Sequence, residues 1–357
     1  MSAMMTKLFL SRIFHTLSLV VTILSVSLSQ DFHFSQYHAS PLQLNPALTG
    51  LINGNYRLNM NYRDQWNKLD GNNFRTTAVS GDMNFKSPVK AFQHDLIGIG
   101  ASILADRSSG FDMNNTELAF NTAYHKSTGK NQFLSLGFKA GLMQRNVNFE
   151  NLRFEDQYIE GSGYSRTTRE FLPENNFSAF DLAIGLHYTW TGSHDQGFTI
   201  GMAVHHLTSP DFSFFNLSLP SGIELLKHPL YGLKSIHASG SFRLSESQIV
   251  IPRMWILSQG PDFQLNLGAL LKIPLDRDGY KNFNVGGFLR SVKNSTGLLP
   301  ESLIPMLGLE LGNVNFGLSY DANLRKIASS YFKQSIFELS FSIIGSSETE
   351  GFFCPRF

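Results

Sequence analysis

Apolar and polar residues alternate along much of this chain, and that period-2 pattern is the feature that most restricts its fold. Between Asn55 and Tyr62, Tyr, Leu and Met occupy every second position, and Asn and Arg occupy the positions between them. Successive side chains of a β-strand point to opposite faces, so this segment predicts a strand with one apolar and one polar face. The same alternation recurs at residues 134–142, 180–190 and 337–343. The sequence therefore predicts an all-β protein.

The pattern predicts roughly fourteen strands of about ten residues each, the length at which a tilted strand spans a bilayer. We place these strands at residues 54–63, 75–85, 95–105, 115–125, 132–145, 179–191, 197–208, 235–245, 249–258, 262–273, 281–291, 303–311, 314–323 and 334–344. No long amphipathic helix is expected between them.

The polar face distinguishes a membrane barrel from an exported soluble sandwich or solenoid, in which residues alternate in the same way. Charged residues make up 16% of the chain, below the roughly 25% of soluble domains. The polar strand positions are mainly Asn, Ser, Gly, Thr and His, which suit a wet and crowded lumen. Because a closed sheet has no edge to expose to lipid, we favour a transmembrane antiparallel β-barrel. The soluble sandwich is the alternative.

The N-terminus resembles an export signal. Lys7 and Arg12 precede an apolar run at residues 16–28, and Ser27 and Ser29 are small residues at the spacing of a cleavage site. We therefore assign residues 1–29 to a signal peptide and residues 30–53 to an irregular periplasmic segment. Residues 54–345 then form the outer-membrane barrel, and residues 346–357 form a C-terminal periplasmic tail.

Connection lengths predict an orientation, because bacterial barrels place long loops outside and short turns in the periplasm. With a periplasmic N-terminus, the outward connections include the long ones at 146–178, 209–234, 292–302 and 324–333. The inward connections are short, at Gly192–Gln196, Ser245–Ser247 and Gly312–Asn313, and the short outward connection Gln259–Asp262 is an exception. We expect the long external loops, 146–178 and 208–233 above all, to contact a partner.

Charge and motifs give little sign of chemistry. The 29 Lys and Arg residues balance 28 Asp and Glu, and removal of Lys7 and Arg12 leaves 27 against 28, so nucleic acid is not an expected partner. His205 and His206 are adjacent in a predicted strand and would face opposite sides, which disfavours a shared metal. The glycine-rich stretch 98–102 lies in a strand, where we interpret it as a site of curvature. Cys354 is the single cysteine and implies no disulfide framework.

Two sets of polar strand residues leave alternatives open. Ser239 and Ser241 share a strand face with His237, as a barrel hydrolase would require, but small residues lining a lumen explain the same pattern. Acidic residues at Asp181, Glu310, Asp321 and Glu338 are expected to pair across the lumen with Arg57, Lys139, Arg243 or Arg290. We expect no enzyme activity, no cofactor and no metal site.

Both ends of the chain resemble one known family. The stretch "DFHFSQYHASPLQLNPALTG" at 31–50, with "YRLNMNYRDQW" at 56–66, resembles the N-terminal signature of the PorP/SprF family of the Bacteroidota type IX secretion system. Its signature positions here are Phe34, Ser35, Gln36, Tyr37, Pro41, Leu44, Asn45, Pro46, Gly50, Tyr62, Arg63, Gln65 and Trp66. The closing motifs "GLSYDANL" at 317–324, "SIFELSFSI" at 335–343 and "CPRF" at 354–357 are similar too, and contribute Tyr320, Asp321, Cys354, Pro355, Arg356 and Phe357.

The resemblance implies a non-enzymatic outer-membrane barrel of the type IX secretion and gliding machinery. Such a protein would help to secrete a partner, an adhesin-like cargo with a C-terminal sorting domain, and anchor it at the cell surface. The cargo would bind the extracellular loops, other secretion or gliding components would bind the periplasmic side, and outer-membrane lipid would surround the barrel. An outer-membrane porin or hydrophobic-solute channel is the alternative function.

Residues 32–50 lack any regular periodicity, and two prolines, Pro41 and Pro46, interrupt them. Proline removes a backbone donor, and the residue before it favours extended geometry, so we expect an irregular segment packed under or into the barrel mouth. Its expected anchors are Phe34, Tyr37, Leu42 and Leu44, with Asn45 turning the chain ahead of Pro46. A disordered leader is the alternative.

Overall fold

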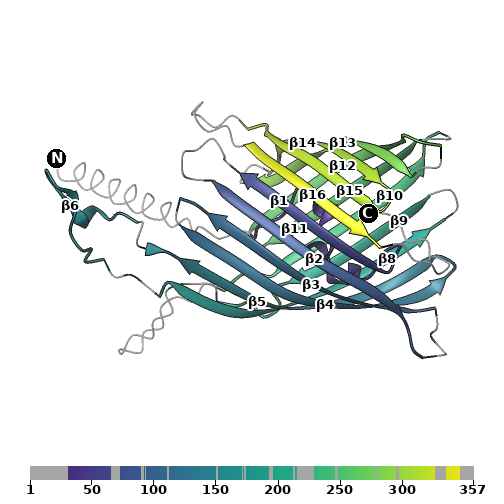
Figure 1. The fold of residues 1–357 in the computed structure, drawn as a ribbon, viewed down its shortest axis with the longest axis horizontal. Coiled ribbons are helices and arrows are strands. Elements are labelled where there is room, and N and C mark those ends of the chain that lie inside the picture. The colour runs from purple at the N-terminus through teal and green to yellow at the C-terminus, as the bar shows by residue number, and fades with distance from the viewer. Residues whose placement is uncertain are drawn as a thin grey trace, which may run out of the picture. The chain divides into compact units, whose positions relative to one another are not determined.

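Fourteen strands of the described residues close into one antiparallel barrel (Figure 1), as seen in a computed structural model of the chain. The structure describes residues 31–65, 73–89, 92, 94–110, 112–149, 152–170, 172, 174–192, 196–211, 214, 229–245, 248–277, 280–294, 297–325 and 335–345. Each strand pairs with its neighbour in sequence, and the first strand pairs with the last to close the sheet. The predicted transmembrane antiparallel barrel is confirmed.

The strands of the barrel occupy the predicted segments. They are β1 Tyr56–Gln65, β2 Phe74–Lys86, β3 Leu96–Ser108, β4 Met113–Gly129, β5 Gln132–Val147, β8 Asn176–Thr191, β9 Gly197–His205, β10 Leu233–Arg243, β11 Ile249–Gln259, β12 Asp262–Pro274, β13 Lys281–Asn294, β14 Gly297–Leu311, β15 Val314–Asn323 and β16 Ser335–Ile344. Two short strands, β6 Tyr158–Ile159 and β7 Gly163–Tyr164, pair separately within the connection between β5 and β8. Among the described residues, no helix is long and apolar enough to cross a membrane.

The distribution of apolar and polar side chains over the two faces of the sheet is the reverse of that in a soluble protein. Outward side chains are apolar and exposed, such as Leu58, Val79 and Phe120, each about half accessible. Inward side chains such as Asn121 and Ser135 are polar and buried. An apolar outer band around a polar lumen is what a bilayer requires of a barrel. The alternation in the sequence is therefore the signature of lipid on one side and lumen on the other.

The three longest connections gather at one end of the barrel, as predicted, but the expectation of a long connection at 292–302 is wrong, because only 295–296 join β13 to β14. Since consecutive strands are antiparallel, the connections 66–73, 148–175, 206–232 and 324–334 all leave the same end. Short turns such as 130–131 and 312–313 lie at the opposite end, where β1 begins and β16 ends. We call these the loop end and the turn end.

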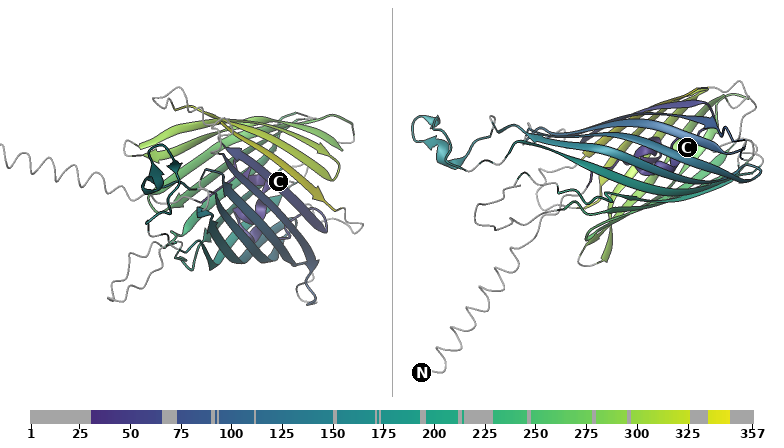
Figure 2. Two further views of the ribbon diagram at one scale, coloured as in Figure 1. Left: turned by 60° about the vertical axis from the view of Figure 1, so that its left-hand side comes forward. Right: turned by 90° about the horizontal axis from the view of Figure 1, so that it is seen from below.

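The segment before β1 lies inside the barrel (Figures 1 and 2), drawn in purple between the strands. It forms three single turns of helix, η1 Tyr37–Ala39, α2 Pro41–Leu44 and η2 Pro46–Leu48. The expectation of extended geometry holds at Asn45, before Pro46, but not for the segment that follows each proline. Pro41 and Pro46 each begin a helical turn, where a missing N–H costs nothing and the fixed φ suits the helix. We call residues 32–53 the luminal segment.

Candidate functional site

Aromatic and aliphatic side chains hold the middle of the luminal segment. The Tyr37 ring lies 4.7 Å from that of Trp255 on β11 and 6.1 Å from that of Phe288 on β13, measured between centroids. Leu44, Leu48 and Leu51 join the same buried cluster, with Leu96, Phe133, Leu257, Leu270, Ile304 and Met306 of the wall. Phe34 packs separately against Ala78 and Leu104. Burial of the four expected anchors, Phe34, Tyr37, Leu42 and Leu44, is therefore observed.

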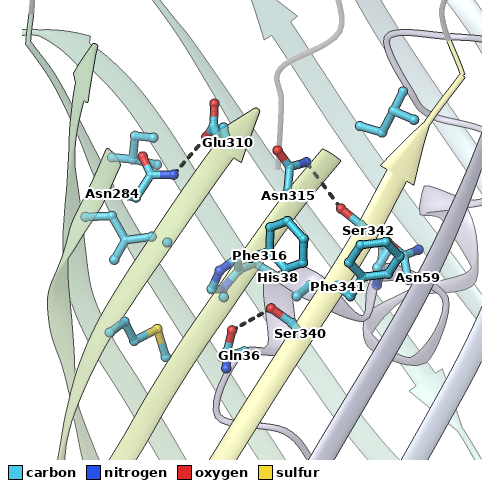
Figure 3. Close-up of a pocket in the computed structure, with 18 of the residues that line it drawn as sticks. Gln36, His38, Asn59, Asn284, Glu310, Asn315, Phe316, Ser340, Phe341 and Ser342 are labelled. Carbon is cyan, nitrogen blue, oxygen red and sulfur yellow. Dashed lines mark hydrogen bonds between the residues drawn. The ribbon is translucent and has the colours of Figure 1, made fainter. Parts of the chain in front are cut away.

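The first polar attachment joins Ser35 and Gln36 to a carboxylate of the last strand. Glu338 on β16 accepts hydrogen bonds from the backbone N–H groups of Ser35, at 2.8 Å, and Gln36, at 2.9 Å. Arg63 on β1 lies 3.3 Å from the same carboxylate and also donates to the carbonyl of His33. The Gln36 amide accepts from Ser340 Oγ at 2.7 Å (Figure 3). The start of the luminal segment is thus fixed to the seam where β16 meets β1.

A second ion pair completes this attachment. Asp321 on β15 accepts from Ser35 Oγ at 2.7 Å and pairs with Arg290 of β13 at 2.8 Å. Arg290 also donates to Ser35 Oγ. Two carboxylates and two guanidiniums, all almost inaccessible to solvent, therefore surround one serine. Buried charges are tolerated when they are paired and hydrogen-bonded, as here. We call Ser35, Gln36, Arg63, Arg290, Asp321 and Glu338 the serine clasp.

A separate attachment holds the other end of the luminal segment. Asp82 on β2 accepts from the Gly50 N–H at 2.7 Å and from Arg57 Nε and Nη2, at 3.0 and 2.7 Å. Arg57 Nη2 also donates to the Leu48 carbonyl at 3.1 Å. Gly50 has a φ of 72°, a left-handed conformation that glycine adopts without strain. The carbonyl of the preceding residue, Thr49, lies 2.8 Å from His125 Nε2 on β4. The glycine clasp is our name for the set formed by Thr49, Gly50, Arg57, Asp82 and His125.

Asn45 turns the chain between the two clasps, as the sequence predicts. Its side-chain oxygen accepts from the Ala47 N–H at 2.8 Å, and its amide donates to the carbonyls of Leu186 on β8 and Met202 on β9, at 3.0 and 3.2 Å. The side chain therefore caps η2 and reaches two adjacent strands.

Glycines of the inner wall make room for this turn. A Cβ added at Gly137 would collide with the backbone of Pro46 and Ala47, and one added at Gly185 would collide with the Asn45 side chain. The stretch 98–102 is similar, because a Cβ at Gly98 would collide with the Thr49 carbonyl. Our interpretation of those glycines as sites of curvature is therefore corrected. They allow close approach of the luminal segment.

The remaining signature residues fall outside this contact network. Tyr62 and Tyr320 are outward-facing, and Tyr320 is 46% exposed to the lipid side. Gln65 ends β1. Trp66, Cys354, Pro355, Arg356 and Phe357 lie outside the described residues, as do residues 1–29 and the tail 346–357.

The expected ion pairs are partly corrected. Asp321 pairs with Arg290, one of the predicted cations. Glu310 pairs instead with Lys272, at 2.6 Å, and Asp181 with His206, at 3.0 Å. Strand register decides these partners, and register cannot be read from a single strand.

The histidines differ from expectation in one respect. β9 ends at His205, and His206 adopts a positive φ of 58°, so both imidazoles are buried. His237 Nε2 lies 3.2 Å from His187 Nδ1 in a stacked pair, and among the described residues His237 Nδ1 has no hydrogen-bond partner. Among the described residues, the hydrogen-bond partner of the His237 ring is therefore His187 and not Ser239 or Ser241.

Several luminal contact residues escape sequence reasoning. Asp82, His125 and Glu338 were not connected to the N-terminal segment, and their partners lie between 32 and 303 residues away in sequence. The signal that points to them is a charged or imidazole side chain at an inward position of a strand, where an unpaired charge is costly.

The connection between β5 and β8 carries a second candidate surface. Its described residues 152–170 contain η5 Glu155–Gln157 and the β6–β7 pair, in which the exposed rings of Tyr158 and Tyr164 meet edge to face at 5.4 Å. Asp156 accepts from Thr168 Oγ1 at 2.9 Å and from the Arg169 N–H, which holds the pKa of this carboxyl below its ordinary value. We call residues 152–170 the loop hairpin.

Comparison with known proteins identifies the family. A family model described as type IX secretion system membrane protein PorP/SprF matches residues 26–343. The chain belongs to the PorP/SprF family. The match spans the luminal segment and all fourteen barrel strands of this PorP/SprF protein except the end of β16. No curated protein matches its sequence.

Solved structures share the barrel architecture at low identity. The Ralstonia pickettii toluene transporter TbuX is 10% identical, with a TM-score of 0.46, covering 86% of this chain and 94% of TbuX. A Pseudomonas aeruginosa FadL homologue is 13% identical, with a TM-score of 0.45, covering 84% of this chain and 92% of that one. BamA from Haemophilus ducreyi lacking POTRA domains 1–3 is 12% identical, with a TM-score of 0.41, covering 81% and 70%.

Proposed function

We propose that this PorP/SprF protein is a closed, non-enzymatic outer-membrane barrel that helps to secrete a partner protein and anchors it at the cell surface through its long loops. The partner is an adhesin-like cargo with a C-terminal sorting domain. Other secretion or gliding components bind the turn end, which faces the periplasm.

The observation that carries this proposal is the occupied lumen. The luminal segment is held by two clasps, which meet the wall on either side of β1, and by a cluster of apolar and aromatic side chains between them. A porin or solute channel needs a continuous polar path, whereas here the luminal segment and its buried side chains occupy part of the lumen. The occupied lumen therefore favours an anchoring role over conduction.

The loop end supplies the binding surface in this proposal. It carries the longest connections, and the loop hairpin exposes Tyr158 and Tyr164, 55% and 52% accessible, among charged residues of both signs. Tyrosine is enriched in protein interfaces because a rigid amphipathic ring buries area at low entropic cost.

A deletion strain tests the proposal. Loss of the gene is expected to leave the cargo inside the cell or shed into the medium, and the wild-type gene should restore surface labelling of intact cells. Complementation with the double variant Tyr158→Ala, Tyr164→Ala should produce a normal amount of barrel and reduced cargo display. Unchanged cargo display in the deletion strain would exclude the anchoring function.

A further inference from the structure

Arg253 on β11 is a buried cation that faces a cavity beside the luminal segment. It is 5% exposed. The cavity has a volume of about 100 Å³ and lies between the luminal segment and the wall formed by β11 to β16 and β1. Figure 3 shows part of its lining, with Gln36 and His38 of the segment across from Asn284 and Glu310 of the wall.

The other buried cations of the described lumen have carboxylate partners. These pairs are Arg57–Asp82, Arg63–Glu338, Lys139–Glu117, Lys272–Glu310 and Arg290–Asp321. Arg253 has no such partner within the described part of the chain, and its Nε and Nη1 groups lack hydrogen-bond acceptors there. A guanidinium cannot lose its proton to relieve this cost, and an uncompensated buried charge is strongly unfavourable.

Two further polar groups near Arg253 lack protein partners. The Tyr37 hydroxyl and His38 Nδ1, both of the luminal segment, have no hydrogen-bond partner among the described residues. The positive charge of Arg253 acts on both side chains. Three polar side chains, one from the wall and two from the segment, therefore have buried polar atoms without hydrogen-bond partners among the described residues.

The net charge of this group is set by Arg253 alone. Burial raises the pKa of Tyr37 and lowers that of His38, so both are neutral near pH 7. Lys272 and Glu310, which also line the cavity, pair at 2.6 Å, so the carboxylate charge of Glu310 that also acts on Arg253 is shared with Lys272, and Arg57 is neutralised by Asp82. One positive charge is left, and one negative charge would balance it.

We propose that Arg253 binds a small monovalent anion, of the size of chloride or formate, in the cavity between β11 and the luminal segment. The guanidinium supplies charge-assisted hydrogen bonds, and the His38 side chain of the luminal segment also lines the cavity. A cavity of about 100 Å³ holds such an ion with a water molecule, since a water occupies about 30 Å³ of liquid. The anion bridges the wall and the luminal segment and strengthens their contact.

Thermal unfolding of the full-length purified protein tests the site in solution. Sodium gluconate, whose anion is too large for the cavity, is replaced stepwise by sodium chloride or sodium formate at constant ionic strength. The wild-type Tm should rise and saturate, because an anion that binds only the folded state stabilises it. Arg253→Met should remove the rise, and Arg253→Lys should weaken binding about tenfold, because lysine lacks the planar fork.

Arg75→Met serves as the matched control, because Arg75 is an exposed arginine in the same barrel. It should keep the wild-type anion response. An equal response in Arg253→Met, or no difference between gluconate and chloride in the wild type, would overturn the proposal.

Crystals grown in sodium bromide provide a direct readout. An anomalous bromide peak within hydrogen-bond reach of Arg253 is expected in the wild type, should be weaker in Arg253→Lys crystals and should be absent in Arg253→Met crystals. Bromide peaks confined to the protein surface would contradict the site, whatever the thermal data show.

Discussion

The luminal segment and the loop hairpin are stabilised in opposite ways. The luminal segment has three single helical turns with their own backbone hydrogen bonds, and it is held in place by long-range contacts to β1, β2, β4, β8, β9, β11, β13, β15 and β16. The loop hairpin is held by contacts within residues 152–170, such as those of Asp156 with Thr168 and Arg169, and exposes its aromatic rings.

This difference separates two roles. Most of the described N-terminal signature residues dock the segment in the lumen, so this motif encodes the contacts between the segment and the wall. Partner recognition then belongs to surfaces that can change without disturbing those contacts. Variants in the clasps should affect closure, and variants in the loop hairpin should affect binding alone.

The largest effect is expected from Glu338→Gln in the serine clasp. The change leaves Arg63 without its carboxylate and weakens two backbone hydrogen bonds, and breaking a buried pair costs about 3–5 kcal/mol. Hydrogen exchange of the Ser35 and Gln36 amides should accelerate strongly.

Glu117→Gln is the control for that change. Glu117 pairs with Lys139 in the lumen at 2.5 Å and belongs to neither clasp. Its loss should destabilise the barrel without selectively accelerating exchange at Ser35 and Gln36. Similar exchange in the two variants would mean that Glu338 does not hold the segment.

Gly137→Ala is expected to have the next largest effect. The added methyl collides with the turn at Pro46, and overpacking typically costs about 1–3 kcal/mol. Limited proteolysis should then cut within residues 32–53. Gly141→Ala makes the same change on the same face of β5, where the nearest atoms are 3.4 Å away, and should resist the protease as the wild type does.

Protonation of His38 at acidic pH should weaken the docking of the luminal segment, with a smaller effect than the two substitutions above. Its pKa lies well below the ordinary value of 6.5, chiefly because of burial and also because of the charge of Arg253. A depressed pKa means that the neutral form favours docking, so stability is complete above pH 6.5 and falls as the pH decreases toward the folded-state value.

The difference between wild type and His38→Phe measures this dependence. The variant keeps an aromatic ring against Phe288 and should lose part of the acid sensitivity of amide exchange in the segment. His94→Phe, at an exposed position, should retain the wild-type dependence. Identical pH profiles for His38→Phe and wild type would exclude this role for His38.

The smallest effect on the barrel is expected from the double variant Tyr158→Ala, Tyr164→Ala. Both rings are exposed and contact each other, so the free energy of unfolding of the barrel should change by less than about 0.5 kcal/mol. Cargo capture should fall by about tenfold or more, as for loss of interface anchors. A pull-down with the secreted cargo, scored beside a thermal melt, separates the two effects.

The sequence predicts the barrel because lipid imposes a repeated constraint on every strand. Residues 54–63 were predicted and β1 spans Tyr56–Gln65, since each outward position in it must be apolar. Arg290–Asp321 was also among the predicted pairs, because two inward charges seldom stay unpaired.

The sequence does not predict which wall residues hold the luminal segment. Its contacts depend on strand register and on closure, and Ser35 meets Glu338 across 303 residues. Proline also fixes φ near a value shared by extended chain and by the first turn of a helix, so Pro41 and Pro46 fit both geometries. The contacts between the luminal segment and the surrounding wall stabilise the helical turns.

Planar-bilayer recording of the purified full-length protein, beside a variant lacking residues 32–50, tests the closed barrel most directly. The full chain should give no stable conductance, and the deletion variant should give an open, ohmic one. Equal conductance from both proteins would show that the luminal segment does not close the lumen and would favour a channel.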